Sequence, residues 1–487
     1  MQLLPRNSIY NNNVLYFIIN VCGETEKTLP GRGKMRCKNS ECDGPFYPIL
    51  FRLTPAPLHL SGEGRCKDDK NKFVKNVDKI FIVTYISIKS GTGEIMPIKI
   101  IAGQVAGGDD FFNRKNEVEI LWQRIKSGSN VIISAPRRVG KTSLVCHIRD
   151  NPRTGYHVLY MITESVNDEN EFFKKMYKHV VAELKAARRF ASFLKNCTKE
   201  TLGRIEKISL SEATVQLSGS GINYYDEFVA LIKSLDCSDE KVVLVVDEFA
   251  QTVMNIRNDQ DDSRAIRFLE NNRTLRQMPE IRSKIQFVYA GSIGLENIVG
   301  RMNASQTIND LNNLVIGPFT PKDAGELILA LAQRPGLVIG PEQVDYLLKK
   351  VEWLIPYYVQ LIAQELDVMM IDATGEKLVT DTMIDAAFER IIEYRNYFEN
   401  WHTRLRASYK KEEYNFAKEV LNTISEAGTM QSAAMFGCAV RQGIEESYKE
   451  VVNALKHDGY INNTPDARTY RFNSPILKAW WFSNVAN

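Results

Sequence analysis

The segment from Asn130 to Val145 constrains the fold of this chain more than any other; it reads Asn-Val-Ile-Ile-Ser-Ala-Pro-Arg-Arg-Val-Gly-Lys-Thr-Ser-Leu-Val. It begins with an apolar run, passes through a short turn, and ends in Gly-Lys-Thr-Ser at the start of a helical pattern. A bound triphosphate needs backbone N–H groups facing one concavity, a helix N-terminus behind them, a lysine for the outer phosphates and a hydroxyl for magnesium. The segment supplies these parts in order, so we expect a strand, a phosphate-binding loop and a helix.

This loop departs from the usual pattern at its first position, where Ala135 replaces a glycine. Because alanine avoids positive φ, we expect the loop to begin in an ordinary conformation, stiffened by Pro136. The alternative is a chance Gly-Lys-Thr in a strand-to-helix turn. The phosphate-loop interpretation makes these residues the candidate nucleotide contacts: Ala135, Pro136, Arg137, Arg138, Val139, Gly140, Lys141, Thr142 and Ser143.

A second motif lies between Lys241 and Phe249, where five consecutive apolar residues precede Asp247 and Glu248. The apolar run is typical of a strand buried on both faces of a parallel sheet. Carboxylates at the end of such a strand are costly without a cation or substrate, so we expect Asp247 to hold magnesium with Thr142, mostly through water. Glu248 would polarise the water that attacks the γ-phosphate. We expect the two motifs to meet where two neighbouring strands end; the alternative for the second is an exposed acidic turn.

A third apolar run, from Lys284 to Gly291, ends at Ser292. The Ser292 hydroxyl could hydrogen-bond the attacking water or the γ-phosphate, so Ser292 joins Glu248 and Lys141 as a candidate catalytic residue. The alternative for Ser292 is a helix N-cap. An arginine near this strand could neutralise transition-state charge, and the sequence does not choose among the candidates. These are Arg264, Arg267, Arg273, Arg276 and Arg301.

Residues 1–95 differ from the rest of the chain. They contain Gly- and Pro-rich patches, no sustained helical period and one strand-like run from Lys79 to Ile88. Our hypothesis is that Met96 is the natural start and that the stretch before it is an upstream extension or a mis-assigned reading frame. The alternative is a genuine, irregular N-terminal module. The four cysteines of this stretch, Cys22, Cys37, Cys42 and Cys66, match no paired zinc knuckle.

Composition places few limits on partners. The net charge is +3, with 25% charged and 44% hydrophobic residues, as in ordinary globular proteins. No apolar run approaches the roughly 20 residues that cross a bilayer. We therefore expect a cytoplasmic protein with no membrane association.

Two further domains are expected after the sheet. A small helical domain is predicted from four segments, Ala324–Ala332, Pro341–Val351, Pro356–Met370 and Asp381–Glu399. Three helices, a hairpin and a last helix then predict a winged helix, in the segments Tyr414–Glu426, Gln431–Gly437, Gly443–His457, Tyr460–Ile461, Tyr470–Phe472 and Ser474–Trp481.

Together these motifs resemble P-loop ATPases of the AAA+/STAND group, and most of all the prokaryotic archaeal-type ATPases with a C-terminal winged helix. The resemblance spans Met96 to the C-terminus and implies an α/β parallel-sheet ATPase domain in 96–318, a helical lid in 319–402 and a winged helix in 403–487. It also implies that Arg114 lies on the adenine side and that Pro356 of the lid contacts the nucleotide, although the glycine of the family's Gly-x-Pro is missing here. The residues that carry it are Phe112–Arg114 with Glu117, Ser134–Thr142, Leu244–Glu248, Gly291–Ser292, Ile316–Phe319, Ile355–Tyr358 and Tyr470–Pro475.

The expected function is a switch protein that binds and slowly hydrolyses Mg-ATP and couples its nucleotide state to the winged helix. The preference for adenine rests on the resemblance. One alternative is a DNA-binding regulator, or a mobile-element or defence protein, in which ATP controls binding to duplex DNA or a protein partner. Another is a scaffold that self-assembles with ATP.

The winged helix has little excess positive charge for DNA. Its third helix carries Glu445, Glu446 and Glu450 against Lys449, Lys456 and, just ahead of it, Arg441, and phosphate affinity grows with each added cation. A protein-contact or autoinhibitory role is therefore favoured somewhat over DNA binding. The best basic patch lies at the start of the domain, leading into its first helix, and consists of Arg404, Arg406, Lys410 and Lys411.

Overall fold

The computed structural model of this chain describes residues 10–11, 14–20, 48–52, 97–186, 203, 221–371 and 377–486. The chain divides into two compact units, Met1–Glu94 and Ile95–Asn487. The first unit contains an antiparallel sheet that was not predicted, formed by β1 (Tyr10–Asn11), β2 (Val14–Asn20) and β3 (Pro48–Arg52). The predicted strand at 79–88, Met96 and the four cysteines of the N-terminal stretch lie outside the described residues.

The second unit is built around a five-stranded parallel sheet. Its strands run, in spatial order, β5 (Tyr156–Ile162), β6 (Lys241–Asp247), β7 (Ile285–Gly291), β4 (Val131–Ser134) and β8 (Asn312–Val315). The predicted strands of the two motifs are therefore present, but β7 lies between them. The expectation that they are neighbours is wrong, because crossover connections let consecutive strands pair in any order, which hydrophobic patterning does not specify. The end of β7 thus lies between the two motifs.

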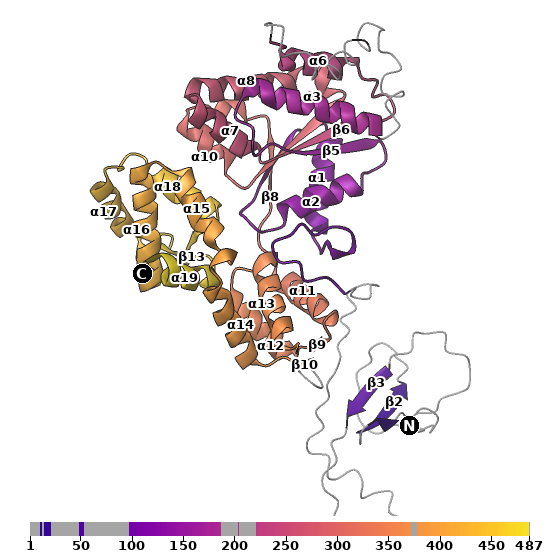
Figure 1. The fold of residues 1–487 in the computed structure, drawn as a ribbon, viewed down its shortest axis with the longest axis vertical. Coiled ribbons are helices and arrows are strands. Elements are labelled where there is room, and N and C mark those ends of the chain that lie inside the picture. The colour runs from indigo at the N-terminus through magenta and orange to yellow at the C-terminus, as the bar shows by residue number, and fades with distance from the viewer. Residues whose placement is uncertain are drawn as a thin grey trace, which may run out of the picture. The chain divides into compact units, whose positions relative to one another are not determined.

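Helices cover both faces of this sheet (Figure 1). On one face, Ile133 and Val245 share an apolar cluster with Trp122 of α1 (Lys115–Lys126) and Leu144 of α2 (Lys141–Asp150). The opposite face has its own cluster. That cluster is formed with α3 (Glu169–Ala186), α6 (Tyr224–Ser234), α7 (Phe249–Asp259), α8 (Asp262–Gln277), α9 (Pro279–Arg282) and α10 (Leu295–Arg301). The six residues of β6 from Val242 to Asp247 are all buried, as its apolar run predicted.

A helical domain follows the sheet. It contains α11 (Pro321–Gln333), α12 (Pro341–Val351), α13 (Pro356–Met369) and α14 (Asp381–Glu393), with a parallel pair of short strands, β9 (Leu337–Val338) and β10 (Lys377–Leu378). Thr320 caps α11 by accepting a hydrogen bond from the backbone N–H of Asp323, with Pro321 in the first turn. The first three predicted helices of this domain are confirmed.

The fourth predicted helix, 381–399, is confirmed as far as Glu393 and wrong over its last third. The helix α14 ends at Glu393, a 3₁₀ turn follows at Arg395–Tyr397, and a new helix, α15 (Glu399–Ser408), begins. If α14 continued, Arg395 and Asn396 would follow the buried Ile391 and Ile392 on the face of the helix that meets the core. The break instead leaves these two polar residues exposed and buries Phe398 completely. α15 also crosses the boundary that was predicted between the lid and the winged helix.

The C-terminal part combines helices with a three-stranded antiparallel sheet, the arrangement of a winged helix. The elements are α16 (Lys411–Ala427), β11 (Met430–Gln431), α17 (Ser432–Gln442), α18 (Tyr448–His457), β12 (Ile461–Asn463), β13 (Thr469–Phe472) and α19 (Pro475–Trp481). Ser474 caps α19, and the two tryptophans at its end are fully buried. The predicted fold class, an α/β parallel-sheet domain followed by a helical lid and a winged helix, is confirmed.

The winged helix contacts the sheet domain. α18 lies against α10, where Arg301 forms ion pairs with Glu413 at 3.3 Å and with Glu450 at 3.7 Å. His457, the last residue of α18, has its Nε2 at 2.8 Å from Ser134 Oγ at the end of β4. The described helices include none with the length and apolar character needed to cross a membrane.

Candidate active site

The predicted phosphate-binding loop connects β4 to α2. Ala135 does not have a positive φ, as expected, whereas Arg138 has a φ of 66° and Gly140 a φ of 94°. α2 begins at Lys141, directly after Gly140, so its unpaired backbone N–H groups face the space above the loop. Ala135 itself is buried in the core and does not line that space.

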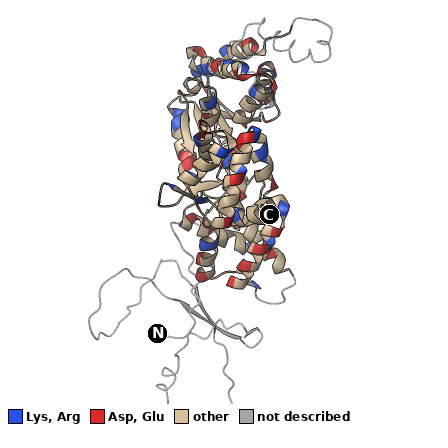
Figure 2. Cartoon of the chain, turned by 90° about the vertical axis from the view of Figure 1, so that its left-hand side faces the viewer, with Lys and Arg blue, Asp and Glu red and all other residues tan. Residues whose placement is uncertain are grey.

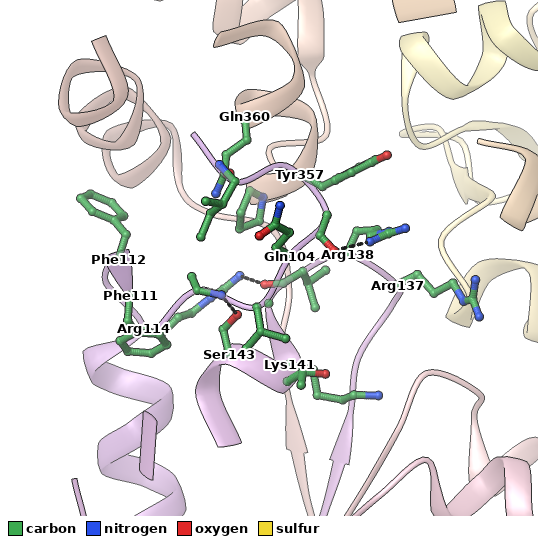
Figure 3. A pocket seen from close by; sticks show the side chains of 18 of the residues that line it. Gln104, Phe111, Phe112, Arg114, Arg137, Arg138, Lys141, Ser143, Tyr357 and Gln360 are labelled. Atoms are coloured by element: carbon green, nitrogen blue, oxygen red, sulfur yellow. Dashed lines mark hydrogen bonds between the residues drawn. The ribbon is translucent and has the colours of Figure 1, made fainter. Parts of the chain in front are cut away.

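A cavity of about 420 Å³ lies over this loop, within the usual size range of small-molecule sites (Figure 3). Its floor is the loop from Pro136 to Ser143, and Glu248 and Ser292 contribute one end. The remaining wall includes the predicted contacts Arg114 and Pro356. Other lining residues, which were not predicted, come from the segment just before α1 and from the lid. They include Gln104, Phe111, Phe112, Phe319, Tyr357 and Gln360.

The structure brings the two sequence motifs together. Lys141 Nζ lies 3.6 Å from Asp247 Oδ1 and 3.5 Å from Glu248 Oε1, and the Thr142 hydroxyl donates to Asp247 Oδ2 at 3.3 Å. Lys141 and Asp247 are only 7% and 3% exposed, so Asp247 lies almost enclosed behind the loop and does not line the cavity. The carboxylate of Asp247 and the hydroxyl of Thr142 thus lie side by side, as two oxygens that a divalent cation could bind.

These residues fit a magnesium ion better than a structural metal. In the described part of the chain, no three His, Cys, Asp or Glu residues cluster closely enough to hold a metal ion by themselves. Magnesium usually takes one or two protein ligands and completes its shell with water and substrate phosphates. Thr142 and Asp247 supply that number of oxygen ligands.

Tyr160 of β5 also contacts Asp247, and this residue was not predicted. Its hydroxyl donates to Asp247 Oδ2 at 3.0 Å, and the backbone N–H of Glu248 donates to Oδ1 at 3.0 Å. Burial raises the pKa of Tyr160, and the charge of Asp247 raises it further, so the phenol stays a hydrogen-bond donor. The Asp247 carboxylate is therefore fixed on both oxygens.

Glu248 is held in an unusual backbone conformation beside Ser292. Its φ is 58°, a left-handed value that costs a non-glycine residue about 1–2 kcal/mol. Ser292 Oγ donates to Glu248 at 3.2 Å, and the backbone N–H of Ser292 donates at 3.3 Å. Burial raises the pKa of Glu248, but the charges of Lys141 and Arg404 and the hydrogen bonds from Ser292 outweigh it, so the net pKa is lowered. The carboxylate is therefore ionised at neutral pH.

The alternative role for Ser292, a helix N-cap, is excluded by the geometry. The cap residue of α10 is Gly294, and Ser292 instead lies between Glu248 and Arg404 of α15. Arg404 Nη1 donates to Ser292 Oγ at 2.7 Å, and Arg404 is only 9% exposed. The prediction that Arg404 belongs to an exposed basic patch is therefore wrong, because α15 turns this side chain into the site and leaves Arg406 exposed.

None of the five arginines that flank β7 in sequence lines the described cavity. Arg276 instead donates to both Asp310 oxygens at 2.7 and 2.8 Å, and Arg301 pairs with residues of the winged helix. Arg404, which lies 112 residues beyond Ser292 in the chain, reaches the site from a helix whose start was not predicted. Its only sequence signal is its place beside Trp401 and Leu405, which are both buried at helical spacing.

Arg114 supports the phosphate-binding loop through hydrogen bonds. Its guanidinium donates to Val139 O at 2.9 Å, to Gly317 O at 2.8 Å and to Glu117 at 2.7 Å, and it lies 4.3 Å from the centre of the Phe319 ring. These contacts tie the loop to the segment that leads into the lid. Arg114 lines the cavity, but its hydrogen bonds go to the protein.

Two other predicted loop residues also make protein contacts. Arg138 donates to Gly103 O at 3.0 Å and lies over the Tyr357 ring, 4.7 Å from its centre. Ser143 Oγ accepts a hydrogen bond from Ala106 N at 3.0 Å. Figure 3 shows the segment before α1, which carries Gln104, above the loop. No periodic pattern in the sequence indicates this placement.

Comparison with known proteins gives a fold but no family. Neither the family models nor the curated proteins give a match. Among solved structures, the chain is similar to the Walker-type ATPase PABY2304 of Pyrococcus abyssi, with 13% identity, a TM-score of 0.54, and coverage of 78% of this chain and 99% of that one. The Aeropyrum pernix ORC2 protein matches with a TM-score of 0.46 at 13% identity, over 79% of this chain and 94% of its own. The first likeness identifies the fold as that of a P-loop ATPase.

Proposed function

We propose that this chain binds Mg-ATP and hydrolyses it slowly, as a switch whose nucleotide state is coupled to the winged helix. The observation that carries the proposal is the convergence of Lys141, Thr142, Asp247 and Glu248 at the N-terminus of one helix. Two motifs about a hundred residues apart meet beside a cavity of about 420 Å³. Such a constellation supports phosphate and metal binding.

Each residue has a distinct part in this proposal. The loop N–H groups and Lys141 hold the phosphates, and Thr142 and Asp247 hold magnesium, with Tyr160 fixing the carboxylate. Bound magnesium would neutralise charge that develops on the phosphate oxygens. Glu248 orients the attacking water and accepts its proton, and Ser292 positions Glu248.

Slow turnover follows from the hydrogen bonds of Glu248. Both of its carboxylate oxygens accept from Ser292, and Oε1 also lies 3.5 Å from Lys141. A carboxylate with this many donors is a weak base, because its ionised form is stabilised. Water activation therefore requires these contacts to loosen.

The contacts of the winged helix support the switch over duplex DNA binding in this conformation. α18, the helix that would enter a major groove, packs against α10, and its Glu450 pairs with Arg301. Figure 2 shows acidic and basic residues interspersed over the visible face rather than one basic surface. Binding of duplex DNA would require α18 to separate from α10, and the charges of α18 would add little to the affinity for DNA phosphates.

Phosphate release from Mg-ATP tests the proposal. We expect measurable turnover that needs Mg²⁺, and a decrease of at least about a hundredfold in Glu248→Gln, which keeps the shape of the side chain but not its basicity. The matched control is Glu240→Gln, which makes the same change in an acidic residue just before β6 and outside the cavity lining. Undiminished hydrolysis by Glu248→Gln would contradict the assigned role.

A further inference from the structure

We propose that Arg404, together with Arg137, binds the terminal phosphate of the nucleotide and thereby distinguishes a triphosphate from a diphosphate. The inference rests on the proposed function and adds a residue to it. Arg404 belongs to α15, outside the phosphate loop, the strand ends and the four lid helices α11–α14.

The first observation is the incomplete hydrogen bonding of Arg404. Its Nη1 donates to Ser292 Oγ, whereas Nε and Nη2 are buried and have no hydrogen-bond partner in the described part of the chain. Buried guanidinium N–H groups without acceptors are costly, and a planar fork of donors matches the oxygens of a phosphate. A phosphate offers several oxygen acceptors for these two nitrogens.

The second observation is a second guanidinium nearby. Burial lowers the pKa of Arg137 to about 10, and the positive charge of Arg404 contributes to this, while Glu248, Asp458 and Tyr460 act in the opposite direction. Figure 3 shows the Arg137 side chain extending from the loop toward the C-terminal part of the chain. Two arginines that repel each other beside a phosphate-binding loop become mutually compatible once an anion lies between them.

The third observation is the position of this pair. Lys141, Glu248 and Ser292 all line the cavity, and a terminal phosphate would lie beside them, since the loop lysine reaches the outer phosphates. Arg404 does not itself line the cavity, but it donates a hydrogen bond to Ser292, which does, and Asn400, one turn earlier on α15, also lines the cavity. A diphosphate would stop short of Arg404, so the contact depends on the third phosphate.

A structural consequence follows from the place of α15 in the chain. α15 connects the lid helix α14 to α16 of the winged helix, so a phosphate bound by Arg404 would fix the winged helix against the sheet domain. A ligand shifts a conformational equilibrium only by its differential affinity for the two states, and Arg404 supplies that difference in a single chain.

Equilibrium binding of Mg-ATPγS and Mg-ADP, measured by calorimetry, tests the inference without turnover. We expect Arg404→Gln to weaken ATPγS binding by about ten- to hundredfold, the range for lost charge-assisted hydrogen bonds, and ADP binding by less than about threefold. Arg406→Gln is the matched control, because it removes the same charge from an exposed position on the same helix, and it should leave both affinities unchanged.

The outcomes separate this inference from the proposed function. Equal losses for ATPγS and ADP, or no loss, in a protein that binds both nucleotides would overturn the role of Arg404 and leave the ATPase proposal standing. A wild-type chain that binds neither nucleotide would overturn both. If Arg404→Gln does not fold, Arg137→Gln decides: a selective loss of ATPγS supports the pair, and an unchanged ratio of the two affinities refutes it.

Discussion

Replacing Tyr160 by phenylalanine removes one hydroxyl and should weaken magnesium binding without changing the fold. In the structure, Asp247 Oδ2 accepts hydrogen bonds from Tyr160 at 3.0 Å and from Thr142 at 3.3 Å. If Thr142 turned to ligate magnesium, Tyr160 would be the one remaining side chain among the described residues that donates to this oxygen. The substitution therefore acts on the metal through Asp247.

The expected magnitude follows from the charge of the acceptor. A hydrogen bond to an ionised group contributes about 1.5–3 kcal/mol, and residues that orient metal ligands typically change metal affinity by about 10–100-fold. Water replaces part of the lost bond, so we expect the Mg²⁺ concentration for half-maximal ATP binding to rise by about tenfold. ATP affinity without Mg²⁺ should not change, because Tyr160 does not line the cavity.

The assay is a titration of Mg²⁺ at fixed ATP, read by nucleotide binding, with Tyr156→Phe as the control. Tyr156 begins the same strand, and its ring packs on Trp122 rather than near Asp247. A magnesium requirement that is the same in Tyr160→Phe and wild type would refute the reasoning, as would an equal shift in the control.

Three further predictions concern the loop, the domain contact and pH. Gly140→Ala places alanine at a φ of 94° with no steric neighbour, so strain alone should destabilise the fold by about 1–2 kcal/mol and lower the melting temperature. Gly459→Ala directs a methyl group into the ring of Trp353 at a φ of 85°, and chemical denaturation should show a loss of about 3 kcal/mol, more than for Gly140→Ala. The lowered pKa of Glu248 means that its stabilising charge is present above the unfolded value near 4.3 and is lost as pH falls through the folded value. Unfolding curves of wild type and Glu248→Gln should therefore differ most in pH dependence below about pH 4.3, and a difference centred near pH 7 would contradict the lowered pKa.

The parts of the site that could be predicted are those encoded by neighbouring residues. The loop before Lys141 and the two carboxylates at the end of β6 each follow an apolar run that ends at the same edge of the sheet. Ser292 was predicted for the same reason, and its place between the motifs follows from the position of β7.

The parts that could not be predicted depend on contacts distant in sequence. Tyr160 meets Asp247 only because β5 and β6 pair in register, and Arg404 meets Ser292 across 112 residues of the chain. β8 was not predicted, because only Leu314 of its four residues is buried and its sequence has no alternation of apolar and polar residues. The turn before α15 was missed because no proline or glycine marks it, although the polar Arg395 and Asn396 occupy the positions where apolar residues would have continued the period of α14.

The central claim is that Lys141 and Asp247 together hold a nucleotide phosphate and its magnesium ion. Equilibrium titration of the purified chain with ATP, with and without Mg²⁺, tests it most directly, using wild type, Lys141→Ala and Asp247→Asn. We expect one ATP per chain, an affinity that Mg²⁺ strengthens in wild type, and a loss of at least about tenfold in Lys141→Ala. In Asp247→Asn the strengthening by Mg²⁺ should disappear. A wild-type chain whose affinity for ATP is absent or indifferent to Mg²⁺ would contradict the account.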